Sequence, residues 1–341
     1  MPVSTSEIVL FKASVNTDSN NNGGRESYTQ VTDNTLYNVF PRVTNAERVA
    51  GLTRYRKIFV HNIDDEQDTL YNVAFFIDKL STGDDYFRIA TGTATDTQND
   101  IDSSYKFYGT GRLNTAVSAG ATSIEVNFFQ TDLNGVLASG DKLYITNLKD
   151  ESDTTHHSEF NEIDSISWSG SVATITLVDQ LQHDYPVSYT DGGETIYTRI
   201  AVYLDLGDLH AYTDSVVATT AGDGDFDDAN HPITGDNKGS VRDTITLTFT
   251  SATAFDASGS YLGSLGSGTT SSDFSPSNPN TSTPYFTVPS AGWMGTWASG
   301  DTLVFELYPA SEAIWMKEVV PAGANSKANN TVVVGIYGES A

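Results

Sequence analysis

Cysteine is absent from the 341 residues, which excludes disulfide bonds, thiolate zinc sites and cysteine nucleophiles. Long apolar runs are also absent, and without a stretch of about 18 apolar residues we expect no membrane-spanning helix and no membrane partner. The opening "MPVSTSEIVLFKASV" has neither a basic n-region nor a long apolar h-region, so we expect no signal peptide.

Motifs for phosphate, dinucleotide or nucleophilic chemistry are missing as well. The chain has no P-loop and no dinucleotide fingerprint, and "GSLGSG" does not have the spacing of a nucleophile elbow. A glycosidase needs two carboxyl groups in one cleft, but among 44 acidic residues some pair can always be chosen. We therefore expect no enzyme, no catalytic residues and no cofactor.

Positive charge is scarce, because 18 Lys and Arg residues face 44 Asp and Glu residues, for a net charge of −26. Such a surface repels phosphate backbones, so nucleic acid is not an expected partner. The simplest interpretation is solubility and mutual repulsion of an abundant protein. Basic surfaces, bound cations or a saline medium are the alternatives.

Helical periodicity is almost absent, whereas alternation of apolar and polar residues recurs along the whole chain. Clear examples are 122–129, 172–179, 196–206 and 243–251. The 17 Tyr and 16 Phe suit half-buried sheet surfaces. The pattern predicts an all-β protein with two or three antiparallel β-sandwich or barrel domains, long polar loops and one short helix.

Three units are expected from the length and from the polar connections between strand patterns. They are an N-terminal β-sandwich over 1–112, a central β domain over 113–240 and a C-terminal β domain over 241–341. The last unit is expected either to pack with the central one or to duplicate it.

Several local elements are predicted from turn and cap residues. "TNAERVAGL" predicts the helix, with Thr44 or Asn45 as N-cap, Glu47 in the first turn and Gly51 at the end. The strands 54–62 and 69–78 are expected to form a hairpin around an acidic turn, and "SWSGSVATI" a tight hairpin. The polar stretches 16–27 and 255–284 are expected to be long loops or arms.

One tetrapeptide occurs twice, in "LASGDKLYI" (137–145) and "WASGDTLVF" (297–305). Gly140 and Gly300 allow a positive φ, and Asp141 and Asp301 can accept hydrogen bonds from nearby backbone N–H groups, as can the serines at 139 and 299. We interpret the repeat as a strand entry. A catalytic role for the aspartates is the alternative.

Two groups of residues are candidate metal ligands. Asp223, Asp225 and Asp227 have the spacing that opens a calcium-binding EF-hand loop, but the sixth and twelfth positions hold Asp228 and Thr234 instead of Gly and Glu. An irregular surface Ca²⁺ site is the remaining alternative.

The second group lies in "HHSEF" and consists of His156, His157 and Glu159. Neighbouring His side chains in a strand would point to opposite faces, so the two histidines would not bind one metal ion. The other histidines are scattered along the chain, at His61, His183, His210 and His231. No metal site is therefore predicted.

The segment 21–62 contains "NVFPRVTNAE" (38–47) and "AGLTRYRKIFVHN" (50–62), and 297–324 reads "WASGDTLVFELYPASEAIWMKEVVPAGA". In these motifs the chain resembles a family of virion structural proteins encoded by tailed bacteriophages, over about a third of its length. The resemblance implies localisation in the virion, with other virion proteins and further copies of this chain as partners.

The expected function is therefore an exterior accessory component of a tailed-phage virion, a capsid decoration protein first of all. A tail, baseplate or neck component is the alternative. A further alternative is a carbohydrate- or host-surface-binding module, which exposed tryptophans in a groove would favour, at Trp168, Trp293 or Trp297.

Overall fold

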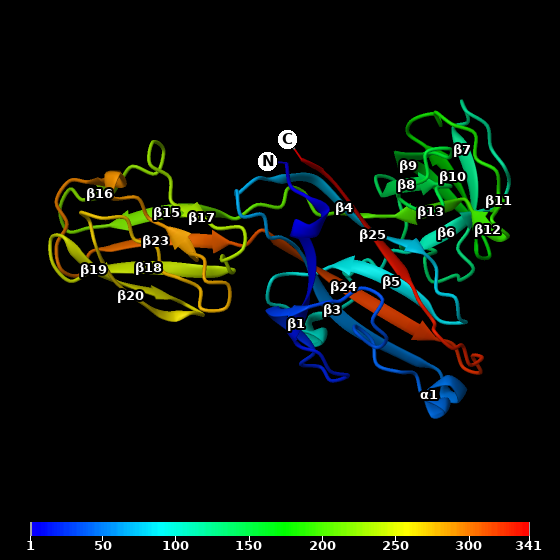
Figure 1. The fold of residues 1–341 in the computed structure, drawn as a ribbon, viewed down its shortest axis with the longest axis horizontal. Coiled ribbons are helices and arrows are strands. Elements are labelled where there is room, and N and C mark those ends of the chain that lie inside the picture. The colour runs from blue at the N-terminus through cyan, green and yellow to red at the C-terminus, as the bar shows by residue number, and fades with distance from the viewer. Residues whose placement is uncertain (1, 341) are drawn as a thin grey trace.

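The computed structural model describes residues 2–340, and these form an all-β protein of several antiparallel sheets (Figure 1). The predicted fold class is confirmed. The one α-helix of this described range is α1 (Asn45–Ala50). Three 3₁₀ turns accompany it: η1 (Thr5–Glu7), η2 (Gln98–Asp100) and η3 (Ser290–Gly292).

Helix α1 begins and ends where its cap residues predict. The hydroxyl of Thr44 accepts from the backbone N–H of Glu47, and the Glu47 carboxylate accepts from the backbone N–H of Thr44 at 2.6 Å. This reciprocal pair is a capping box. Gly51 closes the helix with φ +82° and donates to the Glu47 carbonyl.

The central domain is a sandwich of two sheets that draws strands from both ends of the chain. One sheet has the order β2-β1-β3-β24-β5, with bounds β1 Ile8–Val15, β2 Gly23–Gln30, β3 Leu52–Asn62, β5 Tyr86–Thr91 and β24 Ser311–Val320. The other has the order β14-β4-β25, with bounds β4 Leu70–Lys79, β14 Leu204–Asp205 and β25 Val333–Ser340. Their facing apolar side chains form one core, with Val60, Phe75 and Ile314 at its centre.

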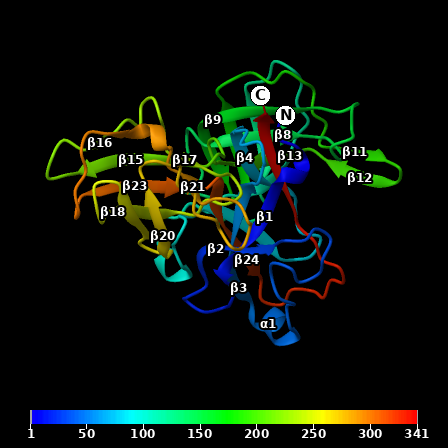
Figure 2. The ribbon, with the colours of Figure 1, turned by 60° about the vertical axis from the view of Figure 1, so that its left-hand side comes forward.

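A closed six-stranded barrel is inserted between β5 and β14. Its order is β10-β7-β6-β13-β8-β9, with bounds β6 Thr110–Leu113, β7 Ser123–Asn127, β8 Lys142–Thr146, β9 Ser158–Ser169, β10 Val172–Leu177 and β13 Arg199–Val202. The hairpin of β11 (Ser188–Asp191) and β12 (Glu194–Tyr197) projects from the barrel (Figure 2). The predicted tight turn between β9 and β10 is confirmed, with Ser169 opposite Val172.

A third domain is inserted between β14 and β24. Its five-stranded sheet has the order β15-β23-β18-β19-β20, with bounds β15 Tyr212–Thr219, β18 Asp243–Phe249, β19 Ala254–Gly259, β20 Gly263–Thr269 and β23 Thr302–Tyr308. Two short pairs accompany it: β16 (Asp225–Phe226) with β22 (Trp293–Met294), and β17 (Thr234–Gly235) with β21 (Phe286–Thr287). Residues of these pairs, Phe226, Phe286 and Trp293 among them, pack against the core face of the sheet.

The sheets do not follow the expected division into 1–112, 113–240 and 241–341. Strand β24 lies between β3 and β5, and β25 pairs with β4, so residues 311–340 belong with the N-terminal strands. The sequence of a strand does not reveal which strand it pairs with. Each strand shows the same alternation of apolar and polar residues whether its partner is near or far along the chain. The chain instead passes from the central domain into the barrel, back to β14, out into the third domain and back again.

Three local predictions are wrong. The stretch 16–27 is not only a loop, because β2 begins at Gly23. Strands β3 and β4 do not form a hairpin, because β3 pairs with β1 and β24 while β4 pairs with β14 and β25; the acidic connection crosses from one sheet to the other. The stretch 255–284 is not only a loop, since it contains most of β19 and all of β20, paired over Ala254–Gly259. Gly and Ser are weak strand formers, but an edge position tolerates them.

The third domain and the barrel lie at opposite ends of the molecule, with the central domain between them (Figure 1). Arg88 of β5 holds Asp132 of the barrel through two hydrogen bonds of 2.8 and 3.1 Å. On the other side, Asn278 donates to the Tyr28 hydroxyl at 2.6 Å. No helix in 2–340 is long and apolar enough to cross a membrane.

Candidate functional site: an open groove in the central domain

The two Ala-Ser-Gly-Asp segments lie in different domains and do not come together in one site. Asp141 precedes β8 of the barrel and Asp301 precedes β23 of the third domain. Each Oδ2 accepts from a backbone N–H three residues earlier, at Ala138 and Ala298, at 2.8 Å in both cases. Gly140 and Gly300 have φ of 92° and 95°. The strand-entry interpretation is therefore confirmed by the geometry.

The carboxylates of Asp223 and Asp228, in the acidic stretch 223–228, accept hydrogen bonds from backbone N–H groups outside the stretch. Asp223 accepts from Thr296 N–H at 2.9 Å, and Asp228 accepts from Ile233 N–H at 3.0 Å. Among residues 2–340 no group of three or more His, Cys, Asp or Glu side chains is arranged to hold a metal ion.

The paired histidines stack on rings instead of converging on one point. His156 lies on Tyr189 with ring centroids 3.8 Å apart, and its Nδ1 is 2.8 Å from Asp153. His157 lies on His183 with centroids 4.0 Å apart. Desolvation and the nearby Asp153 raise the pKa of Tyr189 to about 12.

Trp168, Trp293 and Trp297, the candidate carbohydrate-binding tryptophans, do not line a groove. Trp297 is buried, while Trp293 and Trp168 are half-buried against the cores of the third domain and the barrel. Trp297 stacks on Phe249 with centroids 4.2 Å apart. These rings are packing residues.

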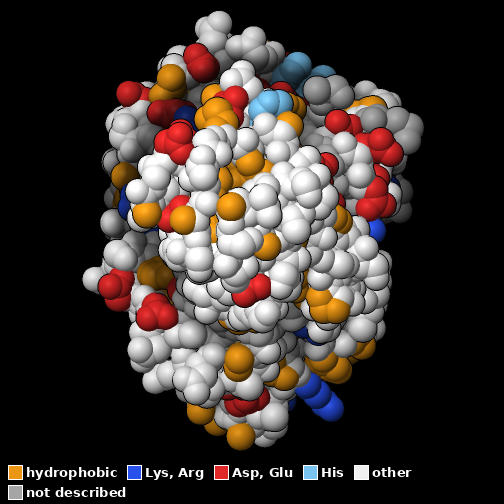
Figure 3. All heavy atoms as spheres, turned by 90° about the vertical axis from the view of Figure 1, so that its left-hand side faces the viewer, with side chains coloured by type: hydrophobic (Ala, Val, Ile, Leu, Met, Phe, Trp, Pro, Cys, Tyr) orange, Lys and Arg blue, Asp and Glu red, His pale blue; other side chains and the backbone are white. Residues whose placement is uncertain are grey.

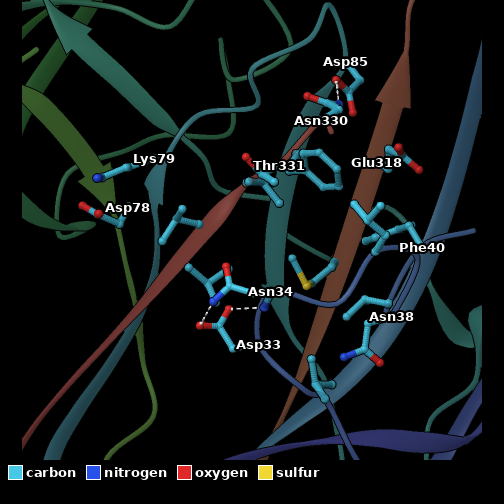
Figure 4. Close-up of a pocket in the computed structure, with 18 of the residues that line it drawn as sticks. Asp33, Asn34, Asn38, Phe40, Asp78, Lys79, Asp85, Glu318, Asn330 and Thr331 are labelled. Carbon is cyan, nitrogen blue, oxygen red and sulfur yellow. Dashed lines mark hydrogen bonds between the residues drawn. The ribbon is translucent and has the colours of Figure 1, made fainter. Parts of the chain in front are cut away.

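The central domain contains a groove that the sequence did not indicate (Figure 4). It has a volume of about 2260 Å³ and opens along one side of the central sandwich. Strand β25 and the preceding 324–332 segment form one wall, and the 30–45 segment forms the other. The groove is built from residues near both ends of the chain and from residues of the barrel, such as Tyr144 and Arg199, so no contiguous motif could have revealed it.

The floor of the groove is apolar and comes from the sandwich core. Ile58, Phe87 and Met316 lie there, and Phe40 of the 30–45 segment packs edge-on against Phe87 with centroids 5.4 Å apart. Within this segment residues 31–44 carry no strand or helix, and Leu36 and Tyr37 are 53% and 60% exposed. An extended apolar floor under a loosely structured wall is suited to holding another chain.

A cluster of carboxyl and amide groups closes one end of the groove. Glu318 of β24 is buried, and its Oε2 is 2.5 Å from Nε of Arg54. Asp85 accepts from Ser81 at 2.5 Å and from Asn330 at 2.6 Å (Figure 4). Burial raises the pKa of Glu318 above its ordinary value; Arg54 opposes the rise and Asp85 adds to it.

Arg54 joins this cluster to the 30–45 segment. Its guanidinium pairs with the Glu318 carboxylate of β24 and also donates to the Pro41 carbonyl at 2.6 Å. None of the described residues that line the groove is a histidine or cysteine. The ion pair and the hydrogen bond together fix the 30–45 segment to β24.

Strand β25 presents a free edge to the groove. Its backbone partners within the described part of the chain lie in β4, on one side. Val333 and Tyr337 on this strand are 42% and 39% exposed, and no lysine or proline protects the edge. An unprotected edge strand is a template for pairing with a further strand.

Comparison with protein-family models, with curated protein sequences and with solved structures finds no match to this chain.

Proposed function

We propose that the protein is a structural component of a tailed-phage virion, placed on the particle exterior as a capsid decoration protein. Support comes first from the motifs in 21–62 and 297–324, which resemble those of virion structural proteins. Both stretches contribute to the central domain, through β3 and β24, which lie side by side in its larger sheet.

The observation that carries the proposal is the groove beside the free edge of β25. An extended segment of a neighbouring virion protein would pair with β25 through its backbone and place alternate apolar side chains on the groove floor. An extended segment that becomes ordered on binding covers a large surface with few residues. The groove thus supplies the attachment that an accessory protein needs.

The charge supports an exterior position. A net charge of −26 would be repelled by packaged DNA, which carries one negative charge per about 1.7 Å of duplex. The same charge is compatible with the outer surface of a particle, where it promotes solubility.

The test uses phage particles that lack this protein and are complemented with variants. Val333→Lys places a charge on the exposed part of the β25 edge, and we expect the variant to be folded but absent from purified particles. Val178→Lys is the matched control, because Val178 is 54% exposed on the barrel, away from the groove, and this variant should be incorporated normally.

Copy number per particle separates the positions within the virion. Hundreds of copies are expected for capsid decoration, whereas a small multiple of three or six would place the protein in the tail, baseplate or neck. Particles that are unchanged in composition, stability and infectivity without the protein would refute the virion role altogether.

A further inference from the structure

The outer face of the five-stranded sheet in the third domain is uncovered and carries rows of small side chains. The inner face bears Leu247, Phe255 and Phe305, which are buried in the domain core. Because strand side chains alternate, the residues between them point outward. Strand pairing aligns these outward residues across all five strands.

One such row consists almost entirely of hydroxyl side chains. In strand order it runs Thr219, Thr302, Thr248, Asp256 and Ser267. Asp256 accepts from Ser267 at 2.6 Å, so the one carboxylate of the row is already hydrogen-bonded.

The neighbouring row has no charge at all. It runs Val217, Val304, Thr246, Ser258 and Ser264 in the same strand order. We call these two rows the hydroxyl face. At its margin, Glu306 is paired with Arg242 at 2.5 Å and accepts from Thr244 at 2.8 Å.

The hydroxyl face lies in the least charged part of a strongly acidic chain. Between residues 244 and 300 the only charged side chains are Asp256 and Asp273. Viewed from this end, the molecule shows mainly uncharged side chains and backbone, with few acidic groups (Figure 3). Elsewhere two copies with a charge of −26 each repel one another, so a close approach is least unfavourable here.

The size and shape of the face also fit a second sheet. Strands of six to eight residues, about 3.3 Å per residue and about 4.8 Å apart, give the whole outer face of the sheet a footprint of roughly 550 Å² per copy, of which the two rows cover roughly 320 Å². Two such faces bury about 1,100 Å², which reaches the size of a specific interface. The Thr and Val methyl groups can interdigitate, as they do between packed sheets.

We propose that the hydroxyl face is a self-association surface on which two copies of this chain pack sheet against sheet. Neither row contains an aromatic side chain, which disfavours a polysaccharide as the occupant of the face. The proposal goes beyond the virion role and does not depend on it, because it concerns the purified protein alone.

The first experiment measures the mass of the purified full-length chain by light scattering over a range of concentrations. A species of twice 36.7 kDa is expected, and its dissociation constant should fall as added salt screens the net charge. Thr246→Glu should abolish it, whereas Thr190→Glu, which adds the same charge on the exposed β11 strand, should leave it intact. Unchanged circular dichroism is required of both variants.

A second experiment keeps the proposal testable if Thr246→Glu fails to fold. The chain has no cysteine, so a single Ser258→Cys substitution introduces the one thiol. Oxidation should give a disulfide-linked dimer with Ser258→Cys or with a cysteine at another hydroxyl-face position. Ser167→Cys, on barrel strand β9, is the control and should give no such dimer. A wild-type chain that stays monomeric at millimolar concentration, or a folded Thr246→Glu variant as dimeric as the wild type, would overturn the inference.

Discussion

Asp141 and Asp301 hold the same turn in two different domains. In both turns the glycine before the aspartate donates to a neighbouring strand at 2.8 Å, Gly140 to Ile163 and Gly300 to Phe249. Only the partner of Oδ1 differs, being the Tyr108 hydroxyl in the barrel and the Ala221 N–H in the third domain. The sheets that follow are a closed barrel and an open five-stranded sheet, so the shared sequence encodes a strand entry.

We expect Asp301→Ala to destabilise the third domain by about 2 kcal/mol. Asp301 is buried, and its removal leaves the N–H groups of Ala298 and Ala221 without acceptors. Urea denaturation followed by tryptophan fluorescence measures the effect, since Trp293 and Trp297 lie in that domain. Asp301→Asn retains one acceptor oxygen and should lose less stability than Asp301→Ala. Equal stability of the wild type and both variants would contradict the role of the turn.

The buried ion pair of Lys57 and Asp96 gives a second prediction. Their Nζ and Oδ1 atoms are 2.5 Å apart, and the Lys57 side chain is fully enclosed. Burial lowers the pKa of Lys57, although Asp96 opposes that shift. Lys57→Met should lower the free energy of unfolding by about 3–5 kcal/mol, because it leaves a buried carboxylate without its cation.

The matched control for this pair is the double variant Lys57→Met with Asp96→Leu. Replacing both partners by apolar residues removes the unpaired charge, so we expect the double variant to regain part of the lost stability. Tyr105 and Trp315 donate to Asp96 at 2.6 and 2.7 Å and lose that acceptor, which limits the recovery. Strictly additive losses in chemical denaturation would show that the pair is not coupled.

His61 predicts a pH dependence of stability. Its two ring nitrogens lie 2.6 Å from two acceptors, Glu26 and the Asn237 carbonyl of the third domain, so only the protonated ring satisfies both. Burial alone would lower the pKa of His61, but Glu26 and Asn237 together raise it above the ordinary value. Because the pKa of His61 is raised in the folded protein, its protonated ring stabilises the fold. This contribution to the free energy of unfolding is complete below about pH 6.5 and is lost as the pH rises through the pKa of the folded state.

The measurement compares wild type with His61→Gln in urea between pH 5.5 and 9. The stability difference should be largest at low pH and shrink above pH 6.5. A difference that grows with pH would mean that the ring is held neutral. His210→Gln is the control for general effects of removing an imidazole, because His210 makes no ion pair in the described structure.

The nested connectivity predicts which fragments fold. All buried core residues of the barrel come from 113–202, and those of the third domain from 226–307. Fragments 108–202 and 211–308 should therefore fold alone, with cooperative melting and dispersed NMR spectra. Fragment 1–107 should not, because it lacks β24, the strand between β3 and β5. A cooperatively folded 1–107 fragment would contradict this account.

The amino-acid sequence by itself determined the local structure. Alternation specified the all-β class, Thr44, Glu47 and Gly51 specified the one short helix, and the glycine and aspartate of each Ala-Ser-Gly-Asp segment specified the same turn twice. These features depend on neighbouring residues, so a local pattern contains the necessary information.

Only the tertiary structure decided how the strands are grouped. Strand β24 lies between β3 and β5, and β25 pairs with β4, although more than 200 residues separate the partners. The groove, its free β25 edge and the Arg54–Glu318 pair exist only because of that pairing. Strands meet through generic backbone hydrogen bonds, and partner choice depends on how whole apolar faces pack, which no single stretch of sequence records.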